Sequence, residues 1–138
     1  MTKTLICIVS CALAAAGCAG ATEPAGPIEA QVGDTITLRY GQAAHLDDSI
    51  RIVFRAIEED SRCPVNVTCV WSGDAAVRLD VAKSGTHTGA LVLHSHLQPK
   101  SGDIGGYVIE LVDVAPSRRH PDNVEPSDYS VRIVISRG

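Results

Sequence analysis

The segment Ser49-Ile50-Arg51-Ile52-Val53-Phe54-Arg55-Ala56-Ile57-Glu58 decides the fold class of this chain. Every second residue from Ile50 to Ala56 is apolar, and Arg51 and Arg55 lie between them. Successive side chains of a β-strand point to opposite faces, so this alternation is typical of a strand with one buried and one solvated face. Phe54, the only Phe of the chain, belongs to the apolar set and is expected in the core.

The same period of two recurs along the rest of the chain, in residues 35–40, 75–82, 107–111 and 129–135. Turn residues such as Gly33-Asp34 and Ser84-Gly85 separate these runs, and no stretch of this region has helical periodicity. We therefore predict an all-β domain over residues 30–138, an antiparallel β-sandwich of the immunoglobulin-like kind with about seven short strands.

The N-terminal residues have the order of a secretory signal peptide. Lys3 supplies a positive charge, residues 5–16 are uncharged, and Ala15-Ala16-Gly17-Cys18 ends the run with small residues. This ending resembles the lipobox of bacterial lipoproteins, although Ala15 stands where that motif prefers Leu. The resemblance implies a signal peptide over 1–17, lipidation of Cys18, and a Pro-containing tether over 18–29.

Two other readings of the leader stay open, because Ala19-Gly20-Ala21 is an A-x-A cleavage site and an uncleaved anchor has similar composition. Cleavage after Ala21 would give a soluble periplasmic or secreted protein. In bacterial lipoproteins an Asp after the lipidated Cys is typical of inner-membrane retention, so Ala19 favours the outer membrane. We expect an exported lipoprotein of the bacterial outer membrane that faces the periplasm or the cell surface.

Beyond Cys18, the chain contains only Cys63 and Cys69, and an even count suits one disulfide in an oxidising compartment. The bond would close a short ring in which Pro64 directly follows Cys63. Trp71, two residues beyond Cys69, would share its side of an extended chain and cover the disulfide, and Gly73 would let the chain turn into the next strand. We give both residues a structural role.

The surrounding sequence, Asp60-Ser61-Arg62-Cys63-Pro64 followed by Cys69-Val70-Trp71-Ser72-Gly73, resembles a D-S-R-C-P…C-x-W-x-G motif. A family of small bacterial secreted and lipoprotein β domains carries this motif. The resemblance implies an exported β domain and no reaction.

The charge balance limits the partners. The chain carries a formal charge of −4, which becomes −5 without the leader because Lys3 is the only charge there. Nucleic acid requires a basic face, so we predict no nucleic-acid binding. The only basic cluster, Arg118-Arg119-His120, lies in a long segment with three prolines, 115–128, which is where we expect a protein partner with carboxylate or phosphate groups to bind. We expect this segment, and not the cysteine ring, to carry the contact.

Two groups of polar residues invite a metal interpretation. His94 and His96 share one face of a predicted strand, with His87 as a conceivable third ligand, but no carboxylate stands at a matching spacing. The acidic residues Glu58, Glu59, Asp60 and Asp74 lack the order of a calcium loop. We expect surface histidines and exposed carboxylates, the latter paired with Arg62 and Arg78, and no metal or other cofactor.

No nucleophile elbow, zinc-protease motif or phosphate-binding loop is present in the sequence. We therefore expect a monomeric, non-enzymatic binding or accessory domain, attached to the membrane by its lipid. Two alternatives from other classes remain: an inhibitor that presents the 115–128 loop to a hydrolase, and a periplasmic metal carrier using His94 and His96.

Overall fold

The computed structural model describes residues 25–47 and 49–138. The leader and Cys18 lie outside the described residues. Nine strands and one short 3₁₀ turn follow one another along the chain, and the described residues contain no α-helix. The strands are β1 (Ile28–Ala30), β2 (Thr35–Arg39), β3 (Ala43–Leu46), β4 (Ile50–Asp60), β5 (Ala75–Lys83), β6 (Thr86–His94), β7 (Ser101–Ile104), β8 (Tyr107–Ala115) and β9 (Ser130–Arg137), with the turn η1 (Pro126–Asp128) before β9.

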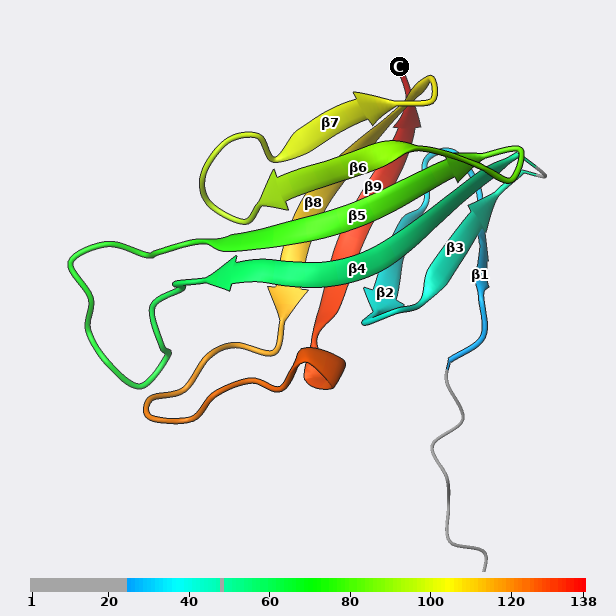
Figure 1. Cartoon of the computed structure of the whole chain (residues 1–138). Helices are drawn as coiled ribbons and strands as arrows, with labels where there is room; N and C mark the ends of the chain where they lie inside the picture. Colours follow the sequence, from blue (N-terminus) through cyan, green and yellow to red (C-terminus); the bar gives the residue numbers. More distant parts are fainter. Residues whose placement is uncertain (1–24, 48) are drawn as a thin grey trace, which may run out of the picture.

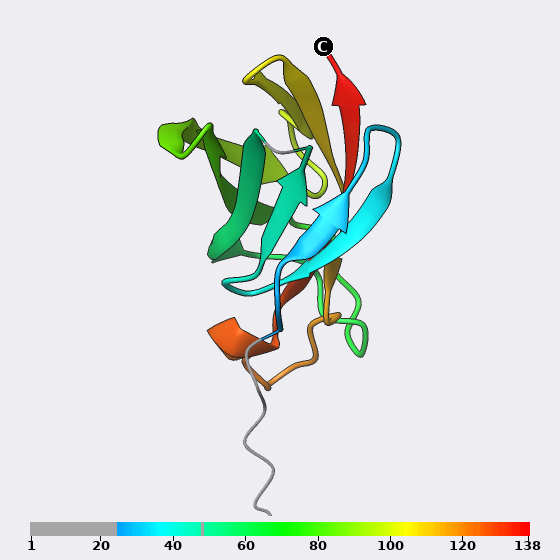
Figure 2. The same cartoon turned by 90° about the vertical axis from the view of Figure 1, so that its right-hand side faces the viewer.

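The strands form two sheets that pack face to face (Figures 1 and 2). One sheet has the order β1-β3-β4-β5-β6 and the other the order β2-β9-β8-β7. All pairings are antiparallel except that of β1 with β3. The predicted all-β sandwich is confirmed. Most neighbouring strands within a sheet are also consecutive in the chain. The likeness to an immunoglobulin domain is therefore limited to the two packed sheets.

The core lies between the sheets and consists of the residues that the alternation selects. Ile50, Ile52 and Phe54 of β4 are at most 2% exposed and belong to the same buried cluster as Val131 and Ile133 of β9. Phe54 also packs edge-on against the ring of Tyr40, with ring centroids 5.9 Å apart. The apolar face of each sheet is thus removed from water, which is the main stabilising term of such a fold.

Three short strands were not predicted: β1, β3 and β7. Of β6, the sequence predicted only a strand around His94, because the rest lacks strict alternation. β1 begins at Ile28, two residues before the expected start of the domain. β6 contains Gly89 next to a register shift in its pairing with β5, which interrupts its pattern. The total is therefore nine strands where about seven were expected.

Three connections meet at one end of the sandwich (Figure 1). They are the cysteine loop between β4 and β5 (61–74), the β6–β7 loop (95–100) and the long loop between β8 and η1 (116–125). We call this region the loop end. It collects the residues that the sequence singled out, and the site described below is built there.

Candidate functional site

The cysteine loop is a stem with a closed ring at its tip. Cys63 and Cys69 form a disulfide with their Cα atoms 6.0 Å apart, as predicted. Backbone hydrogen bonds join the two limbs of the stem, from Ser61 N to Asp74 O at 2.7 Å and from Cys63 N to Ser72 O at 2.7 Å. The loop is therefore a cross-linked extension of the β4–β5 hairpin and not a free segment.

Gly73 occupies a position that only glycine tolerates. Its φ of +68° lies in the left-handed region, and an added Cβ would meet the carbonyl oxygen of Ser61 at 1.9 Å. The close approach follows from the stem, since the 61 and 74 positions are hydrogen bonded across it. Glycine here lets the returning limb lie against the outgoing one.

The expectation that Trp71 covers the disulfide is wrong. Its side chain is 75% exposed, and the neighbouring Val70 is fully exposed. The expectation assumed an extended chain from Cys69, but the returning limb is not a strand and bends at Val70 and Trp71. Val65 and Leu97 are also exposed. The loop end therefore presents apolar side chains to solvent and does not bury them in a second core.

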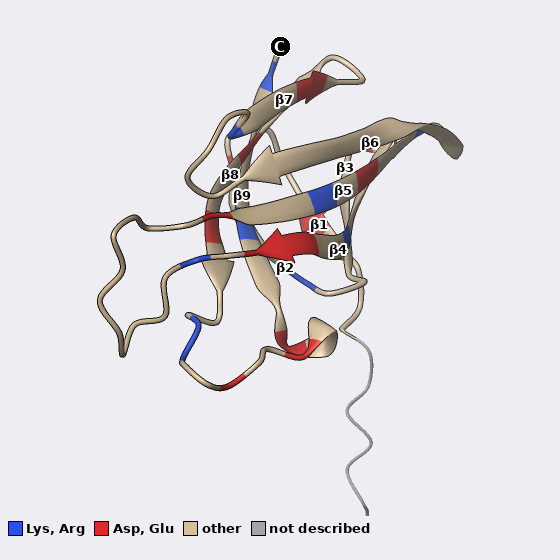
Figure 3. Ribbon diagram, turned by 60° about the vertical axis from the view of Figure 1, so that its left-hand side comes forward, with Lys and Arg blue, Asp and Glu red and all other residues tan. Residues whose placement is uncertain are grey.

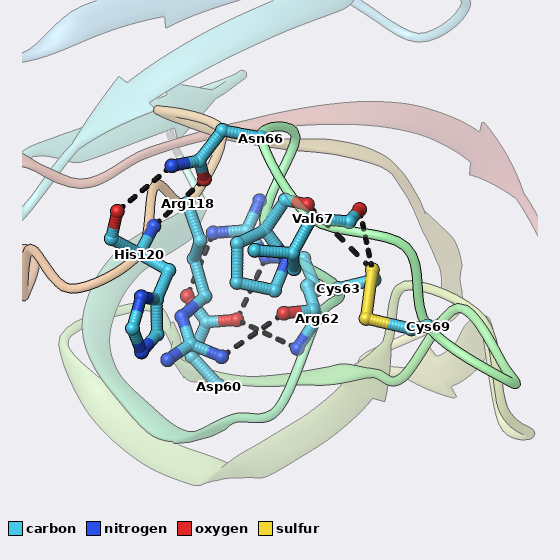
Figure 4. The surroundings of a disulfide bond; sticks show 9 residues. Asp60, Arg62, Cys63, Asn66, Val67, Cys69, Arg118 and His120 are labelled. Carbon is cyan, nitrogen blue, oxygen red and sulfur yellow. Dashed lines mark hydrogen bonds and ion pairs between the residues drawn. A yellow bond between two sulfur atoms is a disulfide. The ribbon is translucent and has the colours of Figure 1, made fainter.

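The long loop binds the ring directly (Figure 4). Asn66 Nδ2 donates to His120 O at 2.8 Å, and His120 N donates to Asn66 Oδ1 at 2.8 Å. The backbone amide of Val65 donates to Arg118 O at 3.0 Å, and the Arg118 guanidinium donates to Arg62 O at 3.0 Å. The ring and the long loop therefore form one unit. The expectation that the long loop, and not the ring, carries the contact with a partner stays a prediction.

The predicted partner-binding residues differ in their availability. Arg118 is half-buried and already bonded to Arg62, whereas the side chains of Arg119 and His120 are exposed. Binding of a carboxylate or phosphate group by this cluster stays a prediction.

A buried ion pair fixes this unit to both sheets. Asp60 and Arg62 have side chains only 8% and 11% exposed, and Arg62 donates to both carboxylate oxygens, at 2.8 and 2.7 Å. The remaining guanidinium bonds go to Val114 O at 2.6 Å and Pro116 O at 3.0 Å. Tyr129 completes the network by donating to Asp60 Oδ2 at 2.8 Å. Every strong polar group of the network is satisfied, as burial requires.

The network shifts the pKa values of its acidic members, Asp60 and Tyr129. Burial alone would raise the pKa of Asp60, but hydrogen bonds from Arg62 and Tyr129 and the charge of Arg62 outweigh burial and lower it. Burial and the hydrogen bond to Asp60 raise the pKa of Tyr129 to about 12. The expectation of an exposed Asp60 is wrong, whereas the pairing of Arg62 with Asp60 and of Arg78 with Glu58 is confirmed.

Asp74 is also buried, at 7% exposure, and it organises the β6–β7 loop. Its Oδ2 bonds His94 Nδ1 at 2.6 Å, and its Oδ1 accepts from the amides of His96 at 2.8 Å and Leu97 at 3.2 Å, and from the Ser95 hydroxyl at 3.2 Å. Burial alone would raise the pKa of Asp74, but these hydrogen bonds, led by the His96 amide, lower it from 3.8 to about 2. Asp74 lies twenty residues from His94 in the sequence, so a search for a carboxylate at a matching spacing along the same strand could not find it.

The Ser95 hydroxyl joins several of these groups. It donates to Asp74 Oδ1 at 3.2 Å, accepts from the Ala75 amide at 2.8 Å and lies 3.0 Å from His96 Nδ1. Which of Ser95 and His96 donates to the other depends on the imidazole tautomer. The hydroxyl therefore helps to hold the β6–β7 loop against β5.

The two histidines do not lie on one face of a strand, because β6 ends at His94 and the chain turns there. His87, at the start of β6, is roughly 20 Å from His94 along the strand and cannot join it as a ligand. Within residues 25–47 and 49–138 no group of three or more His, Cys, Asp or Glu side chains is placed to hold a metal ion.

Two cavities flank the cysteine loop and share Ser72 and His96. The cavity on the Trp71 side has a volume of about 240 Å³ and is lined by Glu59, Ser61, Trp71, Gly73, Asp74, His94 and Leu97 besides the shared pair. The other, of about 340 Å³, lies toward β8 and the long loop and includes Arg118, Val112 and Ser117. The exposed indole thus stands at the rim of a recess with mixed apolar and polar walls.

Comparison with protein-family models, with curated proteins and with solved structures finds no match to this chain. The resemblance of the cysteine segment to a family of exported β domains therefore stays a prediction. Among the described residues, no helix is long and apolar enough to cross a membrane.

Proposed function

We propose that this protein is an exported, lipid-anchored binding domain without catalytic activity, and that it contacts a protein partner through its loop end. Lipidation of Cys18 would hold it at the bacterial outer membrane, facing the periplasm or the surface. The leader order supports export, and the Cys63–Cys69 disulfide is the bond expected of a protein in an oxidising compartment.

One observation carries the binding role. Val65, Val70, Trp71 and Leu97 are all exposed, and all belong to the loop end. Exposed apolar side chains gathered at one end of a small domain are typical of interaction surfaces, and Trp is enriched among the residues that dominate binding energy. Away from the loop end and its flanking cavities, the large exposed apolar residues of the described chain are Val32 and Tyr40.

The loop end is also held in place before any partner arrives. The disulfide, the Arg62–Asp60 pair and the Asp74 hydrogen bonds restrain the three loops from separate directions. A surface that is ordered in advance loses less conformational entropy on binding than a flexible one. This favours binding by the loop end as a rigid body.

The test is site-specific photo-crosslinking in intact cells. A photoreactive residue at Val70 should give a defined crosslinked product, whereas the same residue at Thr86, exposed in the β5–β6 hairpin away from the loop end, should not. Trp71→Ala should abolish the Val70 product without changing the amount of folded protein. Equal products from Val70 and Thr86, or none from either, would reject the proposed binding surface.

A further inference from the structure

The cavity of about 240 Å³ beside Trp71, here called the Trp71 cavity, is lined by acidic and not by basic side chains. Its lining contains the carboxylates of Glu59 and Asp74 and no Lys or Arg. Acidic residues occupy the adjoining ends of β4 and β5 in Figure 3. The basic residues closest along these strands are already paired, Arg62 with Asp60 and Arg78 with Glu58 and Asp80.

The two carboxylates differ in how far their charge is compensated. Asp74 accepts four hydrogen bonds and is enclosed by the β6–β7 loop. The Glu59 carboxylate makes no hydrogen bond or ion pair with any part of the chain that the structure describes, and this residue is exposed at the end of β4. Glu59 therefore supplies the uncompensated negative charge of the cavity.

The indole adds a second attraction for positive charge. Trp71 is the only Trp of the chain and is exposed at the rim of the cavity. The face of an indole carries partial negative charge and binds cations, and Arg gains further from flat stacking on the ring. An apolar plug would desolvate Glu59 without pairing it, which costs free energy. A neutral sugar would stack on the indole but leave the carboxylate charge without a counter-charge.

We propose that this cavity receives an arginine or lysine side chain of the partner polypeptide, with the cation over the Trp71 indole and within reach of the Glu59 carboxylate. The inference rests on the proposed function, since it names the chemistry that the partner brings to the loop end. Val70 and Leu97 would then cover the aliphatic stem of the inserted side chain, as apolar surface does for long cationic residues.

The single tryptophan makes the test direct, because the intrinsic fluorescence of the full chain reports on Trp71 alone among tryptophans. The probes are N-acetyl-arginine amide, N-acetyl-lysine amide, the uncharged isostere N-acetyl-citrulline amide and methyl glucoside. The arginine probe should change the fluorescence saturably in the millimolar range, with the lysine probe weaker and the citrulline probe at least about fivefold weaker, the factor that an exposed charge interaction supplies. Added salt should weaken only the charged probes.

Variants separate the cavity from general charge effects. Glu59→Gln should weaken the arginine probe about fivefold. Glu110→Gln, which removes an exposed carboxylate of β8 outside the cavity, should leave the affinity unchanged. Equal binding of the citrulline probe, stronger binding of methyl glucoside, no response to the arginine probe, or insensitivity to Glu59→Gln would each overturn the inference.

These outcomes are distinguishable from failure of the proposed function. A Val70 crosslink that persists while the arginine probe fails would show a partner of other chemistry at the loop end. Absence of the Val70 crosslink together with saturable arginine binding would instead leave a cationic site without the proposed protein partner.

Discussion

Replacing Asp74 with Asn should show how much stability the β6–β7 loop owes to one carboxylate. In the folded protein the pKa of Asp74 lies at about 2, below its ordinary 3.8, because its hydrogen bonds outweigh the effect of burial. Since a tenfold change in an ionisation equilibrium is worth about 1.4 kcal/mol, ionised Asp74 stabilises the fold by about 2 kcal/mol at neutral pH. Asp74→Asn should therefore lower the free energy of unfolding by about 2 kcal/mol, measured by urea denaturation at pH 7.

The pH dependence follows from the sign of the shift. A carboxyl whose pKa is lowered by folding contributes its stability above the unfolded value and loses it as the pH falls through the folded value. The difference in unfolding free energy between the native protein and Asp74→Asn should thus shrink as the pH falls from about 4 to about 2. Asp113→Asn is the matched control, because Asp113 is exposed and its oxygen lies 3.9 Å from Arg132, so this change should cost less than about 0.5 kcal/mol. A loss below about 0.5 kcal/mol for Asp74→Asn, or a difference that does not change with pH, would refute the reasoning.

Three further changes test other parts of the structure. Gly73→Ala should lower the unfolding free energy by about 3 kcal/mol or more in thermal or urea melts, because a Cβ would meet Ser61 O at 1.9 Å and φ is positive. Replacing Cys63 and Cys69 together with Ser should cost about 2 kcal/mol in the same melts, since the ring they close is short. Trp71→Ala should change stability by less than about 0.5 kcal/mol, as expected of an exposed residue. Finally, mass spectrometry of membrane-extracted protein should find a diacylglyceryl group on Cys18.

The changes at Gly73 and Trp71 each have a matched comparison. Gly85→Ala shares the positive φ of Gly73 but has open space around the added Cβ, so it should cost only about 1 kcal/mol of backbone strain. Equal losses at the two glycines would contradict the close contact in the stem. Phe54→Ala, in the core, should cost about 3–5 kcal/mol, and a similar loss for Trp71→Ala would show that the indole is buried. A soluble mature protein that begins at Thr22 would contradict lipidation.

The sequence predicts the sandwich because its strands bury one face each. The apolar positions of β4 up to Phe54 are buried as expected. The alternation does not hold throughout, because Val53 on the other face is also buried, and bulges interrupt the pairing with β5 between Phe54 and Ala56 and between Ile57 and Glu59. The disulfide was predictable for a different reason, since the leader order predicts export and the two cysteines of the domain have only each other as partners.

The site was less predictable because its contacts join residues far apart in the chain. Asp74 is held by backbone amides more than twenty residues away, and no local pattern marks it as buried. Trp71 resembles a core residue by type, yet it lies on a loop outside both sheets and is 75% exposed. Asn66 and His120, 54 positions apart, meet only because β5 to β8 return the chain to the loop end.

For the lipid anchor proposed above, the parallel strand β1 has a mechanical consequence. β1 is an outermost strand and pairs with β3 over only three positions, from Ile28 opposite Ala44 to Ala30 opposite Leu46. A pull on the tether would load this strand first and strip it before β2, which is paired over five positions with β9. Its release would free residues 28–34, about 23 Å of extended chain, while the two sheets stay packed, and would leave an open edge on β3. In the proposed lipid-anchored state, β1 would thus extend under load before the force reaches the packed sheets.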